Sequence, residues 1–317
     1  MQNGAGESTT GLTGNREHTR AFALLAVLGI FPAGCLSPYA KHAQAFSAAT
    51  NTVIDSSEDA YRGANKLRVD EQVAAAVYDY DKNPAWSPYK DFKPLLTADQ
   101  LDARIKVLDG LKAYAASLVE ITGKPSAADE AALENASAGI GNNLRSLNRN
   151  IAQSFSTAIP NAPTMSATQA DAVSTAVLAL ADYLRARKVK ASLPKVTQDM
   201  NPHIQTLCSL LNDDVQILRR QADVDYQTLA TQLDQSIRHE GTANSPYERR
   251  KEVGALIQIA AQQKANDELL AKLQNTLHGL ALTHQALAAA AQGNNPESIQ
   301  SKIADLSATG TDVGAFY

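Results

Sequence analysis

Apolar residues recur every three or four positions over most of the chain beyond residue 46, a spacing typical of amphipathic α-helices. The clearest series lies between Pro202 and Glu240. Its members are Ile204, Leu207, Leu211, Val215, Leu218, Ala222, Tyr226, Leu229, Leu233 and Ile237. A helix of that length would extend over roughly 58 Å, and Gly241 would end it. No segment alternates between apolar and polar residues in the way of a half-buried strand.

Capping residues predict where the helices begin. Ser245-Pro246-Tyr247-Glu248 is a capping box with proline at the first helical position, and it predicts a second long helix that continues to about Gln292. In this helix Val253 and Ile257 fall on the apolar face. Shorter helices should start at the capping boxes Thr97–Gln100 and Ser166–Gln169.

The remaining helix boundaries follow from prolines and periodicity. Asn201 followed by Pro202 has the order of an N-cap and a first-turn proline, so the first long helix should start there, with Pro194 ending or kinking the helix before it. We expect further helices over 46–78 and 126–155 and a short one after Asn295.

The two long helices, joined by Gly241–Asn244, most simply form an antiparallel hairpin. We therefore predict an all-α fold, an elongated antiparallel helical bundle with long coiled-coil-like helices, over residues 46–308. Residues 309–317 would be a frayed end. Gly139 and Gly141 lie inside a predicted helix and indicate close packing against a neighbouring helix, with a hinge as the alternative.

The N-terminal region has a different pattern. Arg16 and Arg20 precede the unbroken apolar run Ala21–Phe31, and the small residues Ala33 and Gly34 follow it. Basic residues, an apolar run and small residues in this order are typical of a secretory signal peptide. The run is shorter than the roughly 20 apolar residues that a membrane-spanning helix needs.

The ending Ala33-Gly34-Cys35 resembles the lipobox of bacterial lipoproteins. The resemblance implies a signal peptide at 1–34, a lipid on Cys35 and a lipidated tether at 35–45. It also implies attachment to a membrane of the bacterial cell envelope. The residue after the cysteine is Leu36 and not aspartate, which resembles the pattern of lipoproteins sorted to the outer membrane, here facing the periplasm. Ala43-Gln44-Ala45 has the form of an ordinary cleavage site, so secretion without a lipid is the alternative.

Composition limits the partners and the cysteine chemistry. The net charge of −4 argues against nucleic acid as a partner, because such proteins normally carry a basic face. Cys35 is assigned to the lipobox, which leaves Cys208 as the one other cysteine and no intramolecular disulfide. Cys208 falls within a helical apolar pattern and should be a small buried residue, with a reactive thiol as the alternative.

No set of residues predicts catalysis, a metal site or a cofactor, so we do not expect an enzyme. The histidines past the apolar run are scattered and should be exposed or half-buried; they are His42, His203, His239, His278 and His284. Asp79–Lys90 begins like a calcium loop but has Pro84 and Lys90 where glycine and glutamate are required. The doublets Asp213-Asp214 and Arg219-Arg220 are either solvated or form ion pairs between helices.

An aromatic loop is the candidate site that the sequence offers. Five aromatic residues lie close together in a chain with 5% aromatic residues, namely Tyr78, Tyr80, Trp86, Tyr89 and Phe92. They could contact a protein partner or a glycan, or they could fold over the end of the bundle as a lid.

Together these patterns predict an exported, membrane-anchored lipoprotein whose helical bundle binds another envelope protein as a scaffold, adaptor or inhibitor. A homo-oligomer is an open alternative. A second possible function is that of a membrane-active protein resembling the α-helical pore-forming toxins. The nearest candidates for a hydrophobic element that enters lipid are Ala172–Ala181 and Leu280–Ala291.

Overall fold

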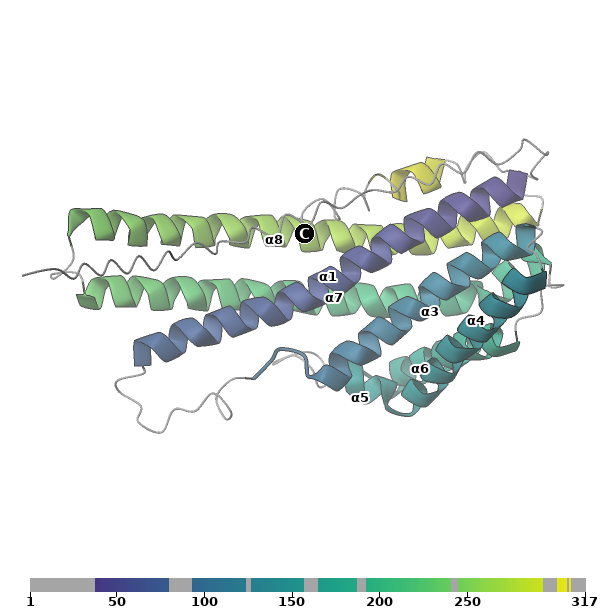
Figure 1. Ribbon diagram of the computed structural model, residues 1–317, viewed down its shortest axis with the longest axis horizontal. Helices are drawn as coiled ribbons and strands as arrows, with labels where there is room; N and C mark the ends of the chain where they lie inside the picture. Colours follow the sequence, from purple (N-terminus) through teal and green to yellow (C-terminus); the bar gives the residue numbers. More distant parts are fainter. Residues whose placement is uncertain are drawn as a thin grey trace, which may run out of the picture. The chain divides into compact units, whose positions relative to one another are not determined.

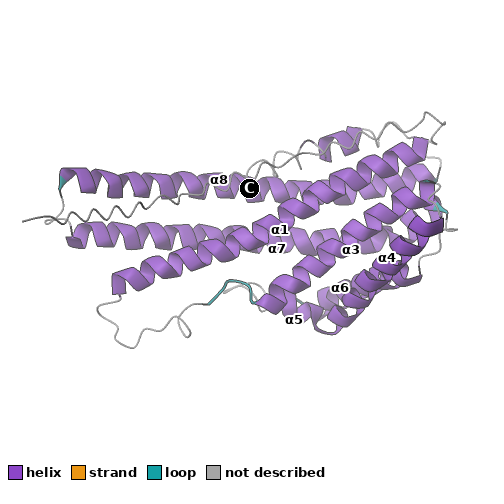
Figure 2. Ribbon diagram, in the orientation of Figure 1, coloured by secondary structure: helices purple, strands orange, loops and turns teal. Residues whose placement is uncertain are grey.

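The computed structural model describes residues 38–79, 93–123, 127–156, 165–186, 192–240, 245–292, 301–306 and 308. Every regular element in these ranges is a helix (Figure 2), so the predicted all-α bundle is confirmed. The chain divides into two units, Met1–Cys35 and Leu36–Tyr317, and all described residues belong to the second. The predicted signal peptide, Cys35 and the predicted frayed end 309–317 lie outside the described residues.

The helices are labelled in Figure 1. Their bounds are α1 Pro38–Asp79, α3 Ala98–Thr122, α4 Ala127–Leu147, a 3-10 turn Asn148–Asn150, α5 Ile151–Ser156, α6 Ala167–Ala186, α7 Leu193–Glu240 and α8 Pro246–Ala291. A short helical segment at 301–306 packs its buried residues Ile303 and Leu306 near α8.

The two longest helices, α7 and α8, form the predicted antiparallel pair (Figure 1). The Gln205 side chain donates to the carbonyl of Ala281, and farther along α7 the Arg219 guanidinium pairs with Asp267. Residues later in α7 therefore contact residues earlier in α8, as in an antiparallel pair. At the start of α8 the side chain of Ser245 accepts from the backbone of Glu248, and the Glu248 carboxylate accepts from the backbone of Ser245. This capping box is confirmed, as are those at Thr97 and Ser166.

Helix α1 begins at Pro38 rather than at Phe46. Ala40 and Ala43 are only 1% and 0% exposed. The predicted tether is therefore wrong for residues 38–45, because these alanines pack into the bundle instead of leaving it. A proline at the first position of a helix costs no hydrogen bond, since the first N–H groups have no partner in the helix.

Helix α7 begins at Leu193 and contains Pro202 in its interior. The prediction that Asn201-Pro202 starts this helix is wrong. Proline lacks an N–H group, so the carbonyl of Gln198 loses its helical hydrogen bond. Gln198 is exposed, and water can take the place of that bond. The packing of residues on both sides of Pro202 keeps the helix continuous, which the local sequence signal does not reveal.

The other helices cover one part of the hairpin. Helix α1 lies against α7 and α8, α3 packs on α1, and α4 and α6 pack against each other, with α6 also touching α7 (Figure 1). At Gly141 a Cβ atom would lie 2.7 Å from the carbonyl oxygen of Ala181, which confirms close packing. At Gly139 the same prediction is wrong, because nothing lies within 4 Å of an added Cβ.

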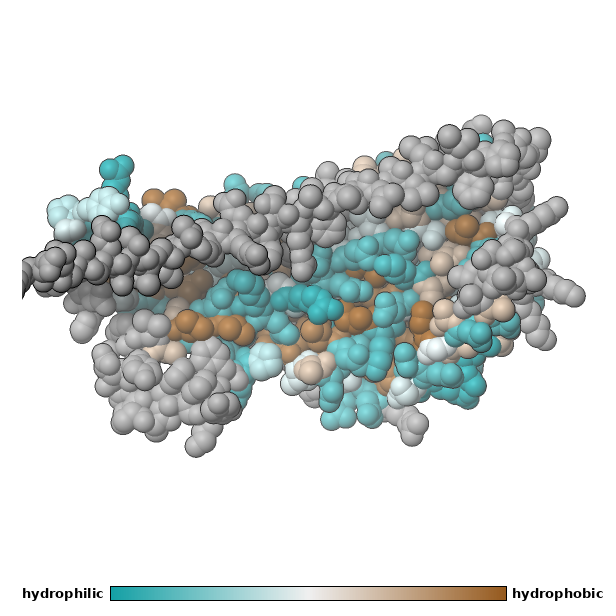
Figure 3. All heavy atoms as spheres, viewed as in Figure 1, coloured by the Kyte–Doolittle hydropathy of each residue, from teal (hydrophilic) through white to brown (hydrophobic). Residues whose placement is uncertain are grey.

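The N-terminal half of α8 lies outside the core. Its buried residues begin at Leu269, whereas Val253 and Ile257 are 44% and 67% exposed. Their predicted inward placement is wrong. In this half of α8 the Gln263 side chain donates to Asp223 of α7, and Gln263 lies on a different face of the helix from Val253 and Ile257. Figure 3 shows a mostly hydrophilic surface on which hydrophobic residues also emerge along α1, where Val69 and Val73 are exposed. Among the described helices, none combines the length and the hydropathy of a membrane-spanning segment.

Candidate functional site: a groove along α7

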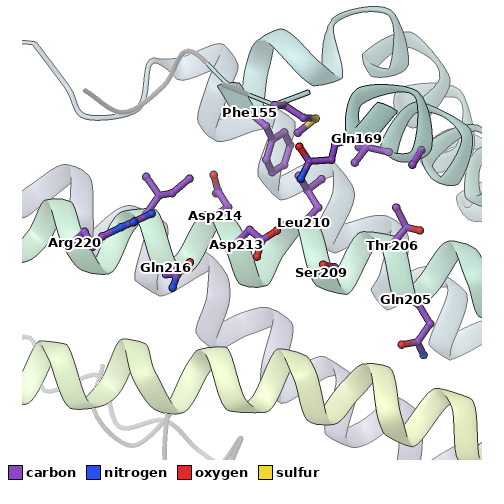
Figure 4. A pocket seen from close by; sticks show the side chains of 14 residues that line it. Phe155, Gln169, Gln205, Thr206, Ser209, Leu210, Asp213, Asp214, Gln216 and Arg220 are labelled. Atoms are coloured by element: carbon purple, nitrogen blue, oxygen red, sulfur yellow. The ribbon is translucent and has the colours of Figure 1, made fainter. Parts of the chain in front are cut away.

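A groove of about 500 Å³ runs along one face of α7, between this helix and the helices α5 and α6 (Figure 4). The wall opposite α7 has Phe155 from α5, Ala172 and Val173 from α6, and Met165, which precedes α6. These residues are apolar. Gln169 stands among them, at the rim of the groove. The groove therefore has an apolar wall on the side of α5 and α6 and a mixed wall on α7, where Leu210 and Ile217 lie among polar residues. A combination of apolar area and polar groups is common in protein-binding and ligand-binding sites.

The face of α7 that lines the groove has a heptad pattern. Thr206, Leu210, Asp213, Ile217 and Arg220 follow one another at alternate steps of four and three residues, and all five line the groove. Leu210 and Ile217 hold one heptad position; the three others hold the second. This spacing is that of a coiled-coil seam, where each side chain packs against a facing helix.

The seam continues beyond the groove to Val224, which follows Ile217 by seven residues and is 52% exposed. Among the described residues, α5 and α6 flank the groove, and Val224 lies outside the set of residues that line it. An apolar residue exposed in register with a coiled-coil pattern marks a surface suited to another helix.

A buried ion pair lies at the inner side of the groove. The guanidinium of Arg104 donates to both carboxylate oxygens of Asp214, over 2.7 and 2.6 Å, and it lies 4.5 Å from the ring of Phe155. Arg104 also donates to the carbonyls of Gln100 and Ser154. Burial acts to lower the pKa of Arg104, but Asp214 outweighs burial and raises it. The ion pair therefore joins α3 and α7 and places α5 beside them.

In each charge doublet one member pairs with another helix and, among the described residues, the other member does not. Asp214 and Arg219 form ion pairs between helices, with Arg104 and Asp267 respectively, and this alternative is confirmed for them. Hydrogen bonds from Arg219 lower the pKa of Asp267. The other members, Asp213 and Arg220, are exposed and line the groove. Burial, and then the neighbouring Asp214, raise the pKa of the Asp213 carboxyl.

A second polar site is fully enclosed. His284 is 0% exposed, its Nδ1 donates to the Asn201 side-chain oxygen over 3.0 Å, and Tyr114 donates to its Nε2 over 2.8 Å. Burial lowers the pKa of His284 to about 3, so the ring is neutral. The same core contains a hydrogen bond of 2.7 Å between Ser117 and Tyr183. These hydrogen bonds connect α3 with α6, α7 and α8.

The prediction of exposed or half-buried histidines is wrong for His284 and confirmed for His42, His203 and His278. The His239 side chain lies outside the described residues. One sequence signal could have revealed the burial of His284. It occupies a place in the apolar series of α8, four residues after Leu280 and three before Leu287, and both of these leucines are buried.

The predicted aromatic site lies almost entirely outside the described residues. Tyr78 lies in the last turn of α1, and the other members, Tyr80, Trp86, Tyr89 and Phe92, lie outside the described residues. The end of that loop is attached to α1, because the Gln72 side chain donates to the Lys93 carbonyl over 2.7 Å and accepts from its N–H over 2.8 Å. The calcium-like segment Asp79–Lys90 also lies almost entirely outside the described residues.

The described residues contain no cluster of side chains placed to hold a metal ion, and their one cysteine is buried. No three His, Cys, Asp or Glu side chains there are placed to hold a metal ion. Burial raises the pKa of the Cys208 thiol to about 12, so the prediction of a small buried cysteine is confirmed. Comparison of the chain with protein-family models, curated proteins and solved structures finds no match. The class that the fold and the site define is an all-helical bundle with a surface groove.

Proposed function

We propose that this protein is an exported lipoprotein, held on a bacterial envelope membrane by a lipid on Cys35, and that its helical unit binds another envelope protein in the α7 groove. The observation that carries the binding function is the heptad seam of α7, where apolar residues line an open groove and Val224 is exposed beyond it. Such a surface loses unfavourable contact with water when a partner covers it.

The start of α1 supports attachment through Cys35. Cleavage after Ala45 would remove Ala40 and Ala43, which are buried in the bundle. Cleavage before Cys35 would keep both alanines. Two residues separate Cys35 from Pro38, and three Cα–Cα steps span at most about 11 Å. A lipid on Cys35 would therefore hold the first turn of α1 close to the membrane surface.

The same attachment would leave the groove accessible to a partner. Helices α1 and α7 run in the same direction, because Phe46 lies near His284, which bonds to Asn201, and Arg68 pairs with Asp225 farther along. With this alignment, the seam from Thr206 to Val224 extends from roughly 20 to 45 Å along the bundle from the start of α1, at about 1.5 Å per residue. A partner in the aqueous phase could reach it.

Intact-mass analysis and membrane fractionation test the attachment, with the protein produced in a bacterial host beside Cys35→Ala. We expect a mature species that begins at Cys35, has added acyl mass and sediments with membranes. Cys35→Ala should lose both the added mass and the sedimentation. A species that begins after Ala45 and has no lipid would contradict this part of the proposal.

Site-specific photo-crosslinking in intact cells tests the binding function. A photoreactive residue at Ser209 or Gln216, which are exposed and line the groove, should give a discrete adduct with an envelope protein. The same residue at Gln262, exposed on α8 away from the groove, should not. Equal adducts at all positions, or none in the groove, would refute the assignment. Dye release from lipid vesicles by the purified protein would instead favour the membrane-active alternative.

A further inference from the structure

If the α7 groove binds a protein, as proposed above, its residues also limit the chemistry of that partner. We infer that the α7 groove receives an amphipathic α-helix with apolar residues at heptad spacing, which presents a cationic side chain to Asp213 and, seven residues away, an anionic side chain to Arg220. The groove, its heptad pattern and its two charges are the observations behind it.

The spacing of the seam selects a helix. From Thr206 to Val224 the seam extends over roughly 27 Å, which corresponds to about 18 residues of a facing helix. Its side chains are on average about 5 Å apart along the axis, as in a coiled coil, and a helix with the same repeat can place one residue in each gap. Helix-in-groove binding of this kind is a common mode of peptide recognition.

An extended peptide would fit less well. Its side chains on one face repeat at about 6.6–6.8 Å, out of register with the seam of α7. Its backbone N–H and C=O groups would also remain without partners in the groove, because the backbone groups of α7 already bond within the helix. A helix brings its own backbone hydrogen bonds and needs only side-chain contacts.

The two charged residues of the groove, Asp213 and Arg220, are the members of their doublets that form no ion pair within the described bundle. Asp214 pairs with Arg104, and Arg219 pairs with Asp267. Within the described part of the chain, Asp213 and Arg220 are exposed and form no ion pair. They occupy the same heptad position one repeat apart, so they would lie on either side of the apolar contact at Ile217. Charges placed in this way determine which helices bind and in which register.

Synthetic peptides test the inference with the full chain carrying Cys35→Ala. The probe is a three-heptad, alanine-rich peptide with leucine at one seam position and lysine and glutamate, one repeat apart, at the other. Two further peptides carry glutamate twice or lysine twice. Because all three are alike in apolar content, differences in affinity report the two charges alone. Fluorescence anisotropy gives the dissociation constants, which we expect in the micromolar range for the mixed peptide.

Charge variants of the protein should change the order of affinities. Asp213→Lys makes both groove charges positive, so the double-glutamate peptide should become the strongest ligand, by about ten-fold over the mixed one. Arg220→Glu should favour the double-lysine peptide to a similar extent. Glu268→Lys reverses an exposed charge on α8 and should leave the order of the three affinities as in the wild type, with the mixed peptide the strongest ligand. These expectations hold whether the bound helix runs parallel or antiparallel to α7.

A pair of valine variants locates the binding site. Val224→Glu places a charge on the seam and should weaken all three peptides, whereas Val253→Glu, at a similarly exposed valine on α8, should not. Circular dichroism checks that each variant keeps its helices. The inference is overturned if binding of every peptide fails to saturate at millimolar concentration, if Val224→Glu does not weaken binding, or if the order of affinities is the same in the charge variants as in the wild type. Groove-specific photo-crosslinks would then still support a protein-binding function with another kind of partner.

Discussion

Arg104 of α3 and Asp214 of α7 form a two-point ion pair that is closed off from solvent, with side chains 0% and 3% exposed. Residues 110 positions apart in the chain thereby hold two layers of the bundle together. An arginine can form this geometry because its guanidinium is planar and presents two parallel N–H groups to a carboxylate. The Nη1 group of Arg104 also donates to two backbone carbonyls, which further compensates the buried cation.

Asp214→Asn should destabilise the fold by about 3–5 kcal/mol, because it leaves the Arg104 cation buried without its anion. Urea denaturation followed by circular dichroism measures the change. Asp213→Asn is the matched control, since it removes the same charge one residue earlier on an exposed site and should change the free energy of unfolding by less than about 0.5 kcal/mol. Similar losses in the two variants would contradict a special role for the buried pair.

The buried His284 should make stability depend on pH. Burial lowers its pKa from 6.5 to about 3. In the window between these values the unfolded chain binds a proton that the folded protein does not, so stability falls as pH is lowered through 6.5 toward 3. The slope should be about 1.4 kcal/mol per pH unit. Above the unfolded pKa this contribution is fully present and independent of pH.

Denaturation curves between pH 4 and 7.5 check this slope. His284→Gln should lose it even if the variant is less stable at every pH, because the test compares slopes and not absolute stabilities. His278→Gln, at an exposed histidine of the same helix, should keep the wild-type slope. If the profiles of wild type and His284→Gln run parallel, another group causes the acid sensitivity.

The sequence predicted those features that depend on local signals. The capping boxes at Thr97, Ser166 and Ser245 satisfy backbone groups within one turn, so they could be placed from four residues alone. The heptad-like spacing of apolar residues predicted α7 and α8 for the same reason. Local signals gave the wrong helix boundary where tertiary packing determines whether a helix continues. Pro202 looked like the start of a helix, and contacts with distant residues instead keep α7 continuous through it.

The groove could not be predicted because it depends on which helix meets which face of α7. The sequence contained the doublets Asp213-Asp214 and Arg219-Arg220, but both members of each look alike locally. Only the position of Arg104, far away in the chain, makes Asp214 the interior member. The aromatic loop had the stronger sequence signal, and four of its five aromatic residues lie outside the described structure.

Two glycines of α4 should respond oppositely to alanine. Alanine is favoured over glycine inside a helix by about 1 kcal/mol, and Gly139 has open space around an added Cβ, so Gly139→Ala should stabilise the protein by about that amount. At Gly141 the Cβ would lie 2.7 Å from both the Ala181 carbonyl oxygen and Cγ of Arg185. Because the backbone of α6 must move to relieve this contact, Gly141→Ala should cost about 1–3 kcal/mol. Chemical denaturation gives the sign of the change in the free energy of unfolding for each variant. Stabilisation by both substitutions would show that α4 and α6 are not in close contact.

The thiol of Cys208 should be unreactive until the protein opens. It is 1% exposed, and burial raises its pKa to about 12, so at pH 8 only about one thiol in 10⁴ is the reactive thiolate. In the Cys35→Ala chain, a thiol-specific disulfide reagent should label it only as fast as local or global unfolding exposes it. Adding Ser209→Cys, at the exposed neighbouring position, should give one fast and one slow equivalent in the same molecule. In urea the two rates should converge, since both thiols are then in water. Two fast equivalents in the native protein would mean that the face of α7 around Cys208 opens to solvent, and that the bundle on which the groove depends is not closed there.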